Sequence, residues 1–202
     1  MSPLLSYIRQ DRRTKDVQEN DHLDAAEAEV SADQDDVAYG CVFCLTGKEQ
    51  LLANRIEEAC PGVCARTMRQ VKYRTCKKVK TREESIAFPG YVFFRAPAET
   101  DIMAQFPRDN VIRLLMPEAK RWQLAGEDER FVEWLFQYDG LLGISQAYKE
   151  GDKIKIVSGP LKDMEGKIKR VDKRGCSGQV ILSFYGKEIP VWLGFELIHA
   201  VK

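Results

Sequence analysis

The chain has 202 residues with 31 basic and 31 acidic side chains, a length suited to one or two globular domains. No run approaches the roughly 20 consecutive apolar residues of a membrane span, and the first residues are too polar for a secretory signal. With six cysteines and no such signal, we expect a cytoplasmic protein with reduced thiols that does not contact a membrane.

The charges are unevenly distributed along the chain. Residues 1–36 contain four basic and ten acidic side chains, whereas 37–139 contain 16 and 14, and 140–202 contain 11 and seven. Apolar residues in the first segment are too sparse to form a core. We therefore predict a disordered acidic tail over residues 1–38, followed by a mildly basic folded part.

The elements expected over residues 39–139 alternate between strands and helices. Thr46-Gly47-Lys48-Glu49 has the spacing of a capping box, in which Thr46 caps a helix and Glu49 reaches back to it. The order of strand, helix, strand, strand, helix, strand predicts an α+β fold of the ferredoxin-like, split-βαβ type. The expected strands are 39–45, 63–68, 91–94 and 111–115, and the expected helices are 46–59, 99–106 and 127–138.

The strand that follows Phe88-Pro89-Gly90 is apolar on both faces. Alternation places Tyr91 and Phe93 on one face and Val92 and Phe94 on the other. A sheet in a small domain usually needs only one dry face, so the second must be covered by a helix or by a partner. A central core strand and a contact surface are the two alternatives.

Eight basic residues and no acidic residue lie between Arg66 and Arg82. The interleaved Val71, Tyr73 and Val79 fit either a β-ribbon or an extended loop. Uncompensated like charges favour a polyanion partner, and Tyr73 is suited to stacking on a base; a solvated loop is the alternative. The predicted nucleic-acid contacts are Lys48, Arg55, Arg66, Arg69, Lys72, Tyr73, Arg74, Lys77 and Lys78.

The C-terminal part has the pattern of a small β-barrel. Residues 140–148 are expected to form a short linker, and short strands with glycine-containing turns then predict a barrel over residues 149–202. Seven glycines between residues 151 and 195 disfavour a helical hairpin in this part, because each costs roughly 0.5–1 kcal/mol in a helix interior.

The cysteine spacings Cys41-x-x-Cys44 and Cys60-x-x-x-Cys64 raise the question of a zinc site. Within a strand, however, the side chains of Cys41 and Cys44 point to opposite faces, and Val42-Phe43 is a poor turn sequence. We interpret the thiols as small core residues and expect no metal and no cofactor.

An enzyme is not expected from these residues. The two histidines, His22 and His199, lie in the predicted tail and beside the C-terminus, so neither suits a Cys–His pair. The sequence also lacks a nucleotide-binding glycine loop and a metalloprotease motif.

Several of these segments together resemble the NusG family. Phe88-Pro89-Gly90-Tyr91 resembles the FPGY strand of its N-terminal (NGN) domain, and Thr46 to Glu49 resembles the first strand-to-helix junction of that domain. The run from Gly151 to Phe195 is similar to the family's KOW domain, an SH3-like barrel. The resemblance covers residues 39 to about 200 and implies an NGN domain at 39–139, a linker at 140–148 and a KOW domain at 149–202.

The resemblance implies a monomeric transcription elongation and antitermination factor. Its NGN domain would bind the clamp helices of RNA polymerase, so that Val92 and Phe94 are core and the opposite face of the strand is the dock. The basic stretch would contact the non-template DNA strand or nascent RNA. The implied polymerase-binding residues are Phe43, Phe88, Pro89, Tyr91 and Phe93.

The KOW domain of such a factor would recruit a further partner, a small-subunit ribosomal protein or the Rho terminator, through Met164 and Trp192. Tyr39 stands where general members have tryptophan, and Met164 stands where many have an aromatic residue. These departures and the acidic tail suggest a specialised paralogue of the RfaH or LoaP type. A KOW-containing RNA- or ribosome-binding protein without polymerase affinity is the alternative.

Overall fold

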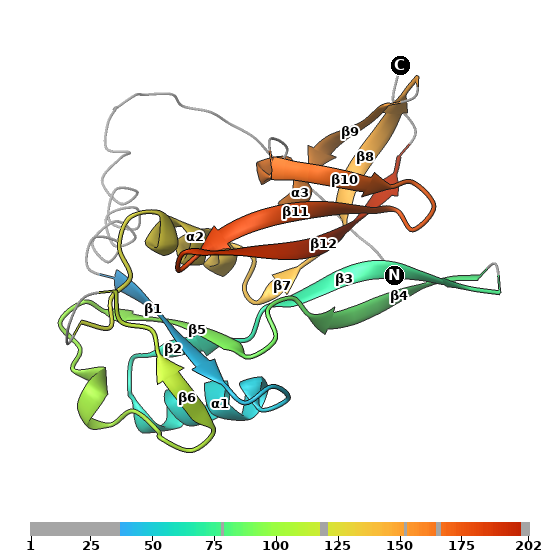
Figure 1. Ribbon diagram of the computed structural model, residues 1–202. Helices are drawn as coiled ribbons and strands as arrows, with labels where there is room; N and C mark the ends of the chain where they lie inside the picture. The colour runs from blue at the N-terminus through green and yellow to red at the C-terminus, as the bar shows by residue number, and fades with distance from the viewer. Residues whose placement is uncertain (1–36, 78, 118–120, 152, 165–166, 199–202) are drawn as a thin grey trace, which may run out of the picture. The chain divides into compact units, whose positions relative to one another are not determined.

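The computed structural model describes residues 37–77, 79–117, 121–151, 153–164 and 167–198 (Figure 1). These described residues belong to one compact unit. The predicted acidic tail lies outside them as far as residue 36, and so does Lys78 of the basic stretch. No helix in the described part of the chain is long and apolar enough to cross a membrane.

A four-stranded antiparallel sheet forms the N-terminal part. Its strand order is β2-β5-β1-β6, so that α1 (Glu49–Ala59) joins two strands lying on either side of β5. The strands agree with those expected from the sequence. They are β1 (Val37–Cys44), β2 (Cys64–Arg66), β5 (Tyr91–Pro97) and β6 (Val111–Leu114).

Helix α1 covers one face of this sheet. Leu52 and Ile56 lie one turn apart and are fully buried. They share a hydrophobic cluster with Val92 and Phe94 of β5. The core assignment of the Val92 and Phe94 face is therefore confirmed.

The capping box predicted at the start of α1 is wrong. The helix begins at Glu49 after Lys48, and no side chain caps it. The Glu49 carboxylate instead accepts hydrogen bonds from the Gly47 N–H at 2.7 Å and from the Gly90 N–H at 2.8 Å. Glu49 thus reaches back to Gly47 rather than to Thr46, and it also holds the turn before β5.

Helix α2 (Glu127–Phe136) contributes to the cover of the other face. The Phe131 ring lies 6.2 Å from that of Phe93 and 5.7 Å from that of Phe88 between centroids. The predicted helix over residues 99–106 is a single turn of 3-10 helix, η1 (Ile102–Ala104). Only Ile102 of that turn is buried, so little packing supports a longer helix.

Residues 69–77 and 79–86 form a two-stranded ribbon, which decides between the ribbon and loop alternatives. β3 (Arg69–Cys76) pairs with β4 (Val79–Ile86) along its whole length, and β7 (Leu141–Leu142) adds a short parallel strand to β3. The ribbon runs beside β12 (Lys187–Leu197) (Figure 1).

The C-terminal part is a five-stranded sheet with the order β10-β11-β12-β8-β9. Its described residues form strands and turns apart from the single-turn helix α3 (Pro160–Asp163), in line with the prediction against a helical hairpin. The other strands are β8 (Ser145–Glu150), β9 (Lys153–Ser158), β10 (Ile168–Asp172) and β11 (Ser177–Phe184).

The linker predicted at residues 140–148 is not a free connection. It contains β7 and the start of β8, and Ser145 is fully buried. The Ser145 hydroxyl accepts a hydrogen bond from the Leu161 N–H at 3.0 Å. In this segment β7 pairs with β3 of the ribbon, and β8 pairs with β9 and β12 of the C-terminal sheet.

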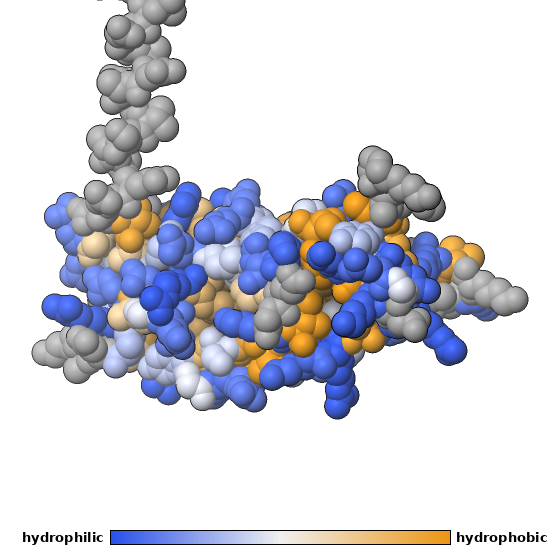
Figure 2. Space-filling model, turned by 90° about the horizontal axis from the view of Figure 1, so that it is seen from above, coloured by the Kyte–Doolittle hydropathy of each residue, from blue (hydrophilic) through white to orange (hydrophobic). Residues whose placement is uncertain are grey.

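One hydrophobic cluster spans both parts of the chain. It contains Phe93 of the N-terminal sheet, Phe131 of α2, and Phe184 and Leu193 of the C-terminal sheet. Seen from above, hydrophobic patches lie between hydrophilic residues on the surface (Figure 2).

Candidate functional site

The aromatic residues predicted to form a dock lie together but differ in exposure. Phe43 and Tyr91 are half-buried neighbours on β1 and β5, with ring centroids 5.1 Å apart, and Pro89 is exposed. Phe88 and Phe93 are buried, the latter completely. The surface that reaches solvent is therefore made by Phe43, Pro89 and Tyr91.

Phe184 of β11 covers the rest of this aromatic surface. Its ring centroid lies 6.1 Å from that of Tyr91, 5.6 Å from that of Phe93 and 5.2 Å from that of Phe131. The face of β5 that carries Tyr91 and Phe93 is thus closed by α2 and by the C-terminal sheet. In this arrangement Phe93, predicted to contact the polymerase, does not reach solvent, because the second apolar face is buried within the chain itself.

Glu49 fixes the turn that presents these aromatic residues, and the sequence pattern did not reveal this role. The side chain is 1% exposed, and its carboxylate holds the backbone of Gly90. Gly90 has φ +82°, and a Cβ there would lie 2.8 Å from the Phe43 ring. The close approach of turn and ring requires glycine.

Two carboxylates hold the C-terminal sheet against α2. Asp163 at the end of α3 accepts a hydrogen bond from Trp134 Nε1 at 2.9 Å and another from the Tyr138 hydroxyl. Burial, with this hydrogen bond, raises the pKa of Tyr138 above its usual value. Asp128 of α2 accepts a hydrogen bond from the Tyr185 N–H at 2.8 Å.

The ribbon also contacts the C-terminal sheet. The Tyr73 hydroxyl donates to Glu196 at 3.3 Å, and Lys80 Nζ donates to Cys176 Sγ at 3.0 Å. At Gly194 the backbones nearly touch, because a Cβ there would lie 2.7 Å from the Val71 carbonyl oxygen. The hydroxyl of Tyr73, whose ring was predicted to stack on a base, is thus hydrogen-bonded to the C-terminal sheet.

Several of the predicted nucleic-acid residues have acidic partners. On the ribbon, Glu83 of β4 lies opposite Lys72, and Glu83 and Glu84 form ion pairs with arginines of β3, so the basic stretch is not uncompensated as the sequence suggested. Lys48 lies at the start of α1, Lys72 is half-buried and Lys77 is exposed in the ribbon turn. The ion pairs are Arg55–Asp109 (3.1 Å), Arg66–Glu57 (2.8 Å), Arg69–Glu84 (3.1 Å) and Arg74–Glu83 (3.5 Å).

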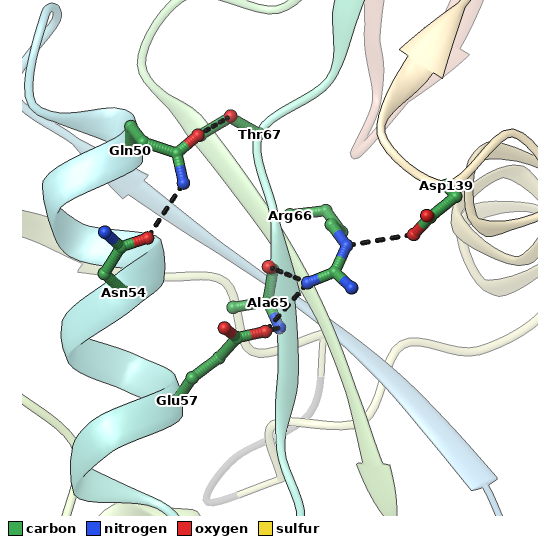
Figure 3. A network of polar contacts seen from close by, with 7 residues as sticks. All are labelled: Gln50, Asn54, Glu57, Ala65, Arg66, Thr67 and Asp139. Carbon is green, nitrogen blue, oxygen red and sulfur yellow. Dashed lines mark hydrogen bonds and ion pairs between the residues drawn. The ribbon is translucent and has the colours of Figure 1, made fainter.

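Arg66 is a structural residue (Figure 3). Its guanidinium bridges Glu57 of α1 and Asp139 after α2, with Nε 3.1 Å from the Asp139 carboxylate. The hydrogen bond to Asp139 is the main cause that raises the pKa of Arg66. Arg66, which the sequence suggested as a nucleic-acid contact, therefore connects α1 to the segment that follows α2.

The two predicted KOW contacts differ in accessibility. Met164 follows Asp163 and is buried, 8% exposed, in the cluster that spans both parts. Trp192 of β12 is half-buried. Of the two, only Trp192 presents a substantial surface in this arrangement.

The cysteines behave as core residues. Cys41 and Cys44 are buried in different clusters on opposite faces of β1, as alternation predicted. Burial raises the pKa of the Cys41 thiol well above its usual value and that of Cys44 to about 11, which disfavours the thiolate form that binds metals. Among the described residues no group of three or more His, Cys, Asp or Glu side chains is arranged to hold a metal ion.

Comparison with protein-family models identifies a KOW motif at residues 150–183. The chain is also similar to two curated proteins named transcription termination/antitermination protein NusG. The protein from Synechocystis is 31% identical over 131 residues, 57% of this chain and 62% of that protein. The protein from Thermus thermophilus is 30% identical over 73 residues, 33% of this chain and 40% of that protein. The matches thus span less than two thirds of either relative.

Among solved structures, one described as "Domain interaction in Thermotoga maritima NusG" matches 78% of this chain and 93% of its own, at 19% identity and a TM-score of 0.45. The curated relatives are named as transcription proteins rather than as enzymes. By sequence, the chain is similar to NusG proteins over part of their length, and its KOW motif lies within the C-terminal sheet.

Proposed function

We propose that this protein is a NusG-type transcription elongation and antitermination factor that acts as a binding protein in the cytoplasm. Residues 39–139 would form an NGN domain of the split-βαβ type, and residues from about 149 a KOW barrel. The first would bind the clamp helices of RNA polymerase, and the second would recruit a ribosomal protein or Rho. The acidic tail favours a specialised paralogue of the RfaH or LoaP type.

The observation that carries this proposal is the apolar second face of β5. Helix α2 covers part of the face that carries Tyr91 and Phe93, and Phe184 of β11 covers the rest. Clustered aromatic side chains in a desolvated patch are the usual source of binding energy at protein interfaces. A face that binds one apolar partner within the chain is suited to bind another from outside.

Polymerase binding through this face requires the C-terminal sheet to leave it. Phe93 is fully buried in the docked arrangement, so a clamp helix reaches only Phe43, Pro89 and Tyr91 before Phe184 moves. The contacts that hold the sheet in place, above all the two donors on Asp163, would then set how readily the factor binds.

The test is capture of RNA polymerase by the purified full chain. Tyr91→Ala should reduce capture at least several-fold, because Tyr91 is a half-buried ring whose loss leaves the fully buried core intact. Asp163→Ala should increase capture, because the docked state then leaves the buried Trp134 Nε1 without its acceptor, at a cost of about 1–3 kcal/mol. The charge variant Lys77→Ala/Lys78→Ala should leave polymerase capture near the wild-type level.

If a folded Tyr91→Ala variant captures as much RNA polymerase as the wild type, the proposed binding surface is wrong. Hydrogen exchange measures whether Asp163→Ala releases the C-terminal sheet from α2. If the sheet is released and polymerase capture does not increase, docking of the sheet does not limit binding.

A second candidate function is a KOW-containing RNA- or ribosome-binding protein without polymerase affinity. The basic ribbon favours it, since Lys72 and Lys77 of β3 and its turn add to the charge of Lys80 and Arg82 along one element. This candidate predicts loss of RNA binding in the Lys77→Ala/Lys78→Ala variant and no polymerase capture by the wild-type chain.

A further inference from the structure

The turn between β10 and β11 lies against the basic ribbon. The turn carries Lys173 and Arg174 and ends at Cys176, whose Sγ is 3.0 Å from Lys80 Nζ of β4. One strand further along the sheet, Glu196 of β12 accepts a hydrogen bond from Tyr73 of β3. Folding thus brings together two basic segments that are about a hundred residues apart in the sequence.

The ribbon face at this junction carries an aromatic ring beside two cations. Tyr73 pairs directly with Arg82 across the ribbon, so the two side chains share a face. Lys80 lies on that face as well, with Nζ 6.0 Å from the Tyr73 ring centroid. A ring flanked by cations is the combination that binds single-stranded nucleic acid.

The two segments are held at a fixed separation. The Gly194 backbone approaches that of Val71 and Lys72 so closely that a side chain there would collide with it. Asp172, the acid of the turn, has one carboxylate oxygen occupied by the backbone N–H groups of Arg174 and Gly175, each at 2.9 Å. The basic residues of the turn and of the ribbon therefore lie on the two sides of one contact, and a polyanion that spans this contact is attracted by both.

We propose that the ribbon and the β10–β11 turn form one composite binding site for single-stranded nucleic acid. This site exists only while the C-terminal sheet is docked. Its ribbon side is Tyr73, Lys80 and Arg82, and its turn side is Lys173 and Arg174. The proposal rests on the proposed nucleic-acid contact of the ribbon and adds the turn and the dependence on docking; it does not depend on polymerase binding.

The experiment measures fluorescence anisotropy of a labelled single-stranded oligothymidylate with the full chain, at low salt and through a salt titration. Three charge reversals are compared: Arg82→Glu on the ribbon, Arg174→Glu in the turn, and Lys187→Glu as the control. Lys187 is exposed at the opposite end of β11 and β12, so it carries the same charge change away from the site. Arg174→Glu is also combined with Asp163→Ala, which weakens docking.

We expect Arg82→Glu and Arg174→Glu each to weaken binding by roughly tenfold and to reduce the salt dependence, with Lys187→Glu close to wild type. In the Asp163→Ala background, Arg174→Glu should have little further effect. Thermal unfolding of each variant verifies that it is folded.

If Arg82→Glu weakens binding while Arg174→Glu matches the Lys187→Glu control, the composite site is wrong and the ribbon contact stands. If neither Arg82→Glu nor Arg174→Glu weakens oligonucleotide binding, the proposed nucleic-acid contact of the ribbon is also wrong. An Arg174→Glu effect that persists undiminished with Asp163→Ala overturns the dependence on docking. A duplex of the same length that binds as tightly, with the same response to the variants, overturns the single-strand assignment.

Discussion

At the scale of single residues, Glu49 has the largest structural consequence for the candidate dock. Its carboxylate connects the start of α1 to the turn before β5 by two hydrogen bonds to backbone N–H groups. A buried carboxylate with two such donors holds its turn more firmly than a neutral acceptor does. The position of Tyr91 and Phe43 therefore depends on a residue that is itself buried.

We predict that Glu49→Gln lowers the free energy of unfolding by about 1–3 kcal/mol, because a buried amide supplies a weaker acceptor to the Gly47 and Gly90 N–H groups. Urea unfolding measures this. Glu58→Gln, on the exposed side of the same helix, is the matched control and should change stability by less than about 0.5 kcal/mol. Equal effects of the two substitutions would contradict the role given to Glu49.

At the scale of elements, the basic ribbon combines structural and exposed charges. The strand β3 supplies Arg69 and Arg74, but Glu84 and Glu83 of β4 form ion pairs with them. Exposed ion pairs of this kind contribute little to stability, typically below about 1 kcal/mol. They do, however, reduce the charge available to a polyanion, which leaves Lys77, Lys80 and Arg82 as the stronger candidates.

We predict that Arg66→Ala lowers stability by about 1 kcal/mol and leaves oligonucleotide affinity unchanged, because Glu57 and Asp139 already neutralise its guanidinium. Arg82→Glu should show the reverse pattern. Urea unfolding and anisotropy on the same preparations separate the two effects. A large loss of oligonucleotide affinity in Arg66→Ala would instead show that Arg66 contributes to nucleic-acid binding.

The contact between α3 and the end of α2 gives a pH-dependent prediction. The folded-state pKa of Tyr138 is raised above its usual value of about 10, so the native state retains this proton when the unfolded chain loses it. The stabilisation is complete below that pH and is lost as the pH rises toward the folded-state pKa.

The fall in unfolding free energy between about pH 9 and pH 11 should therefore be smaller in Tyr138→Phe than in the wild type. Urea unfolding at the two pH values gives both differences. The other tyrosines titrate in both proteins and cancel in the comparison. An identical fall in the two proteins would show that Tyr138 is not a contributor.

At the scale of the whole molecule, one hydrophobic cluster joins the N-terminal sheet, α2 and the C-terminal sheet. Phe184 is its central contribution from the C-terminal side, since its ring contacts three aromatic side chains of the other part. A shared core couples the unfolding of the two parts, which would otherwise be expected to unfold separately.

Calorimetry of the wild-type chain should therefore show a single transition, and Phe184→Ala should separate it into two and lower overall stability by about 3–5 kcal/mol. Ile102→Ala removes a buried side chain from the other cluster and is the control. That control should shift the transition to lower temperature without dividing it. Two transitions in the wild type would contradict the shared core.

How much the sequence revealed depends on the range of the interactions involved. Alternation along β1 and β5 correctly placed Cys41 opposite Cys44, and Val92 with Phe94 in the core, because the period of a strand is a local property. The prediction of a capping box was wrong because the Glu49 carboxylate accepts a hydrogen bond from the N–H of Gly90, 41 residues away. The charge count failed in part because the acids that pair with β3 lie on the neighbouring strand.

The sequence by itself determined that β5 has two apolar faces and that the C-terminal part forms strands, since side-chain periodicity and glycine content act within each segment. Only the tertiary structure decided what covers the second face. That cover is Phe184, more than ninety residues further along the chain, and no local pattern specifies a contact of that range. The same packing brings the β10–β11 turn to the ribbon, because burying Phe184 fixes the position of every strand that pairs with β11.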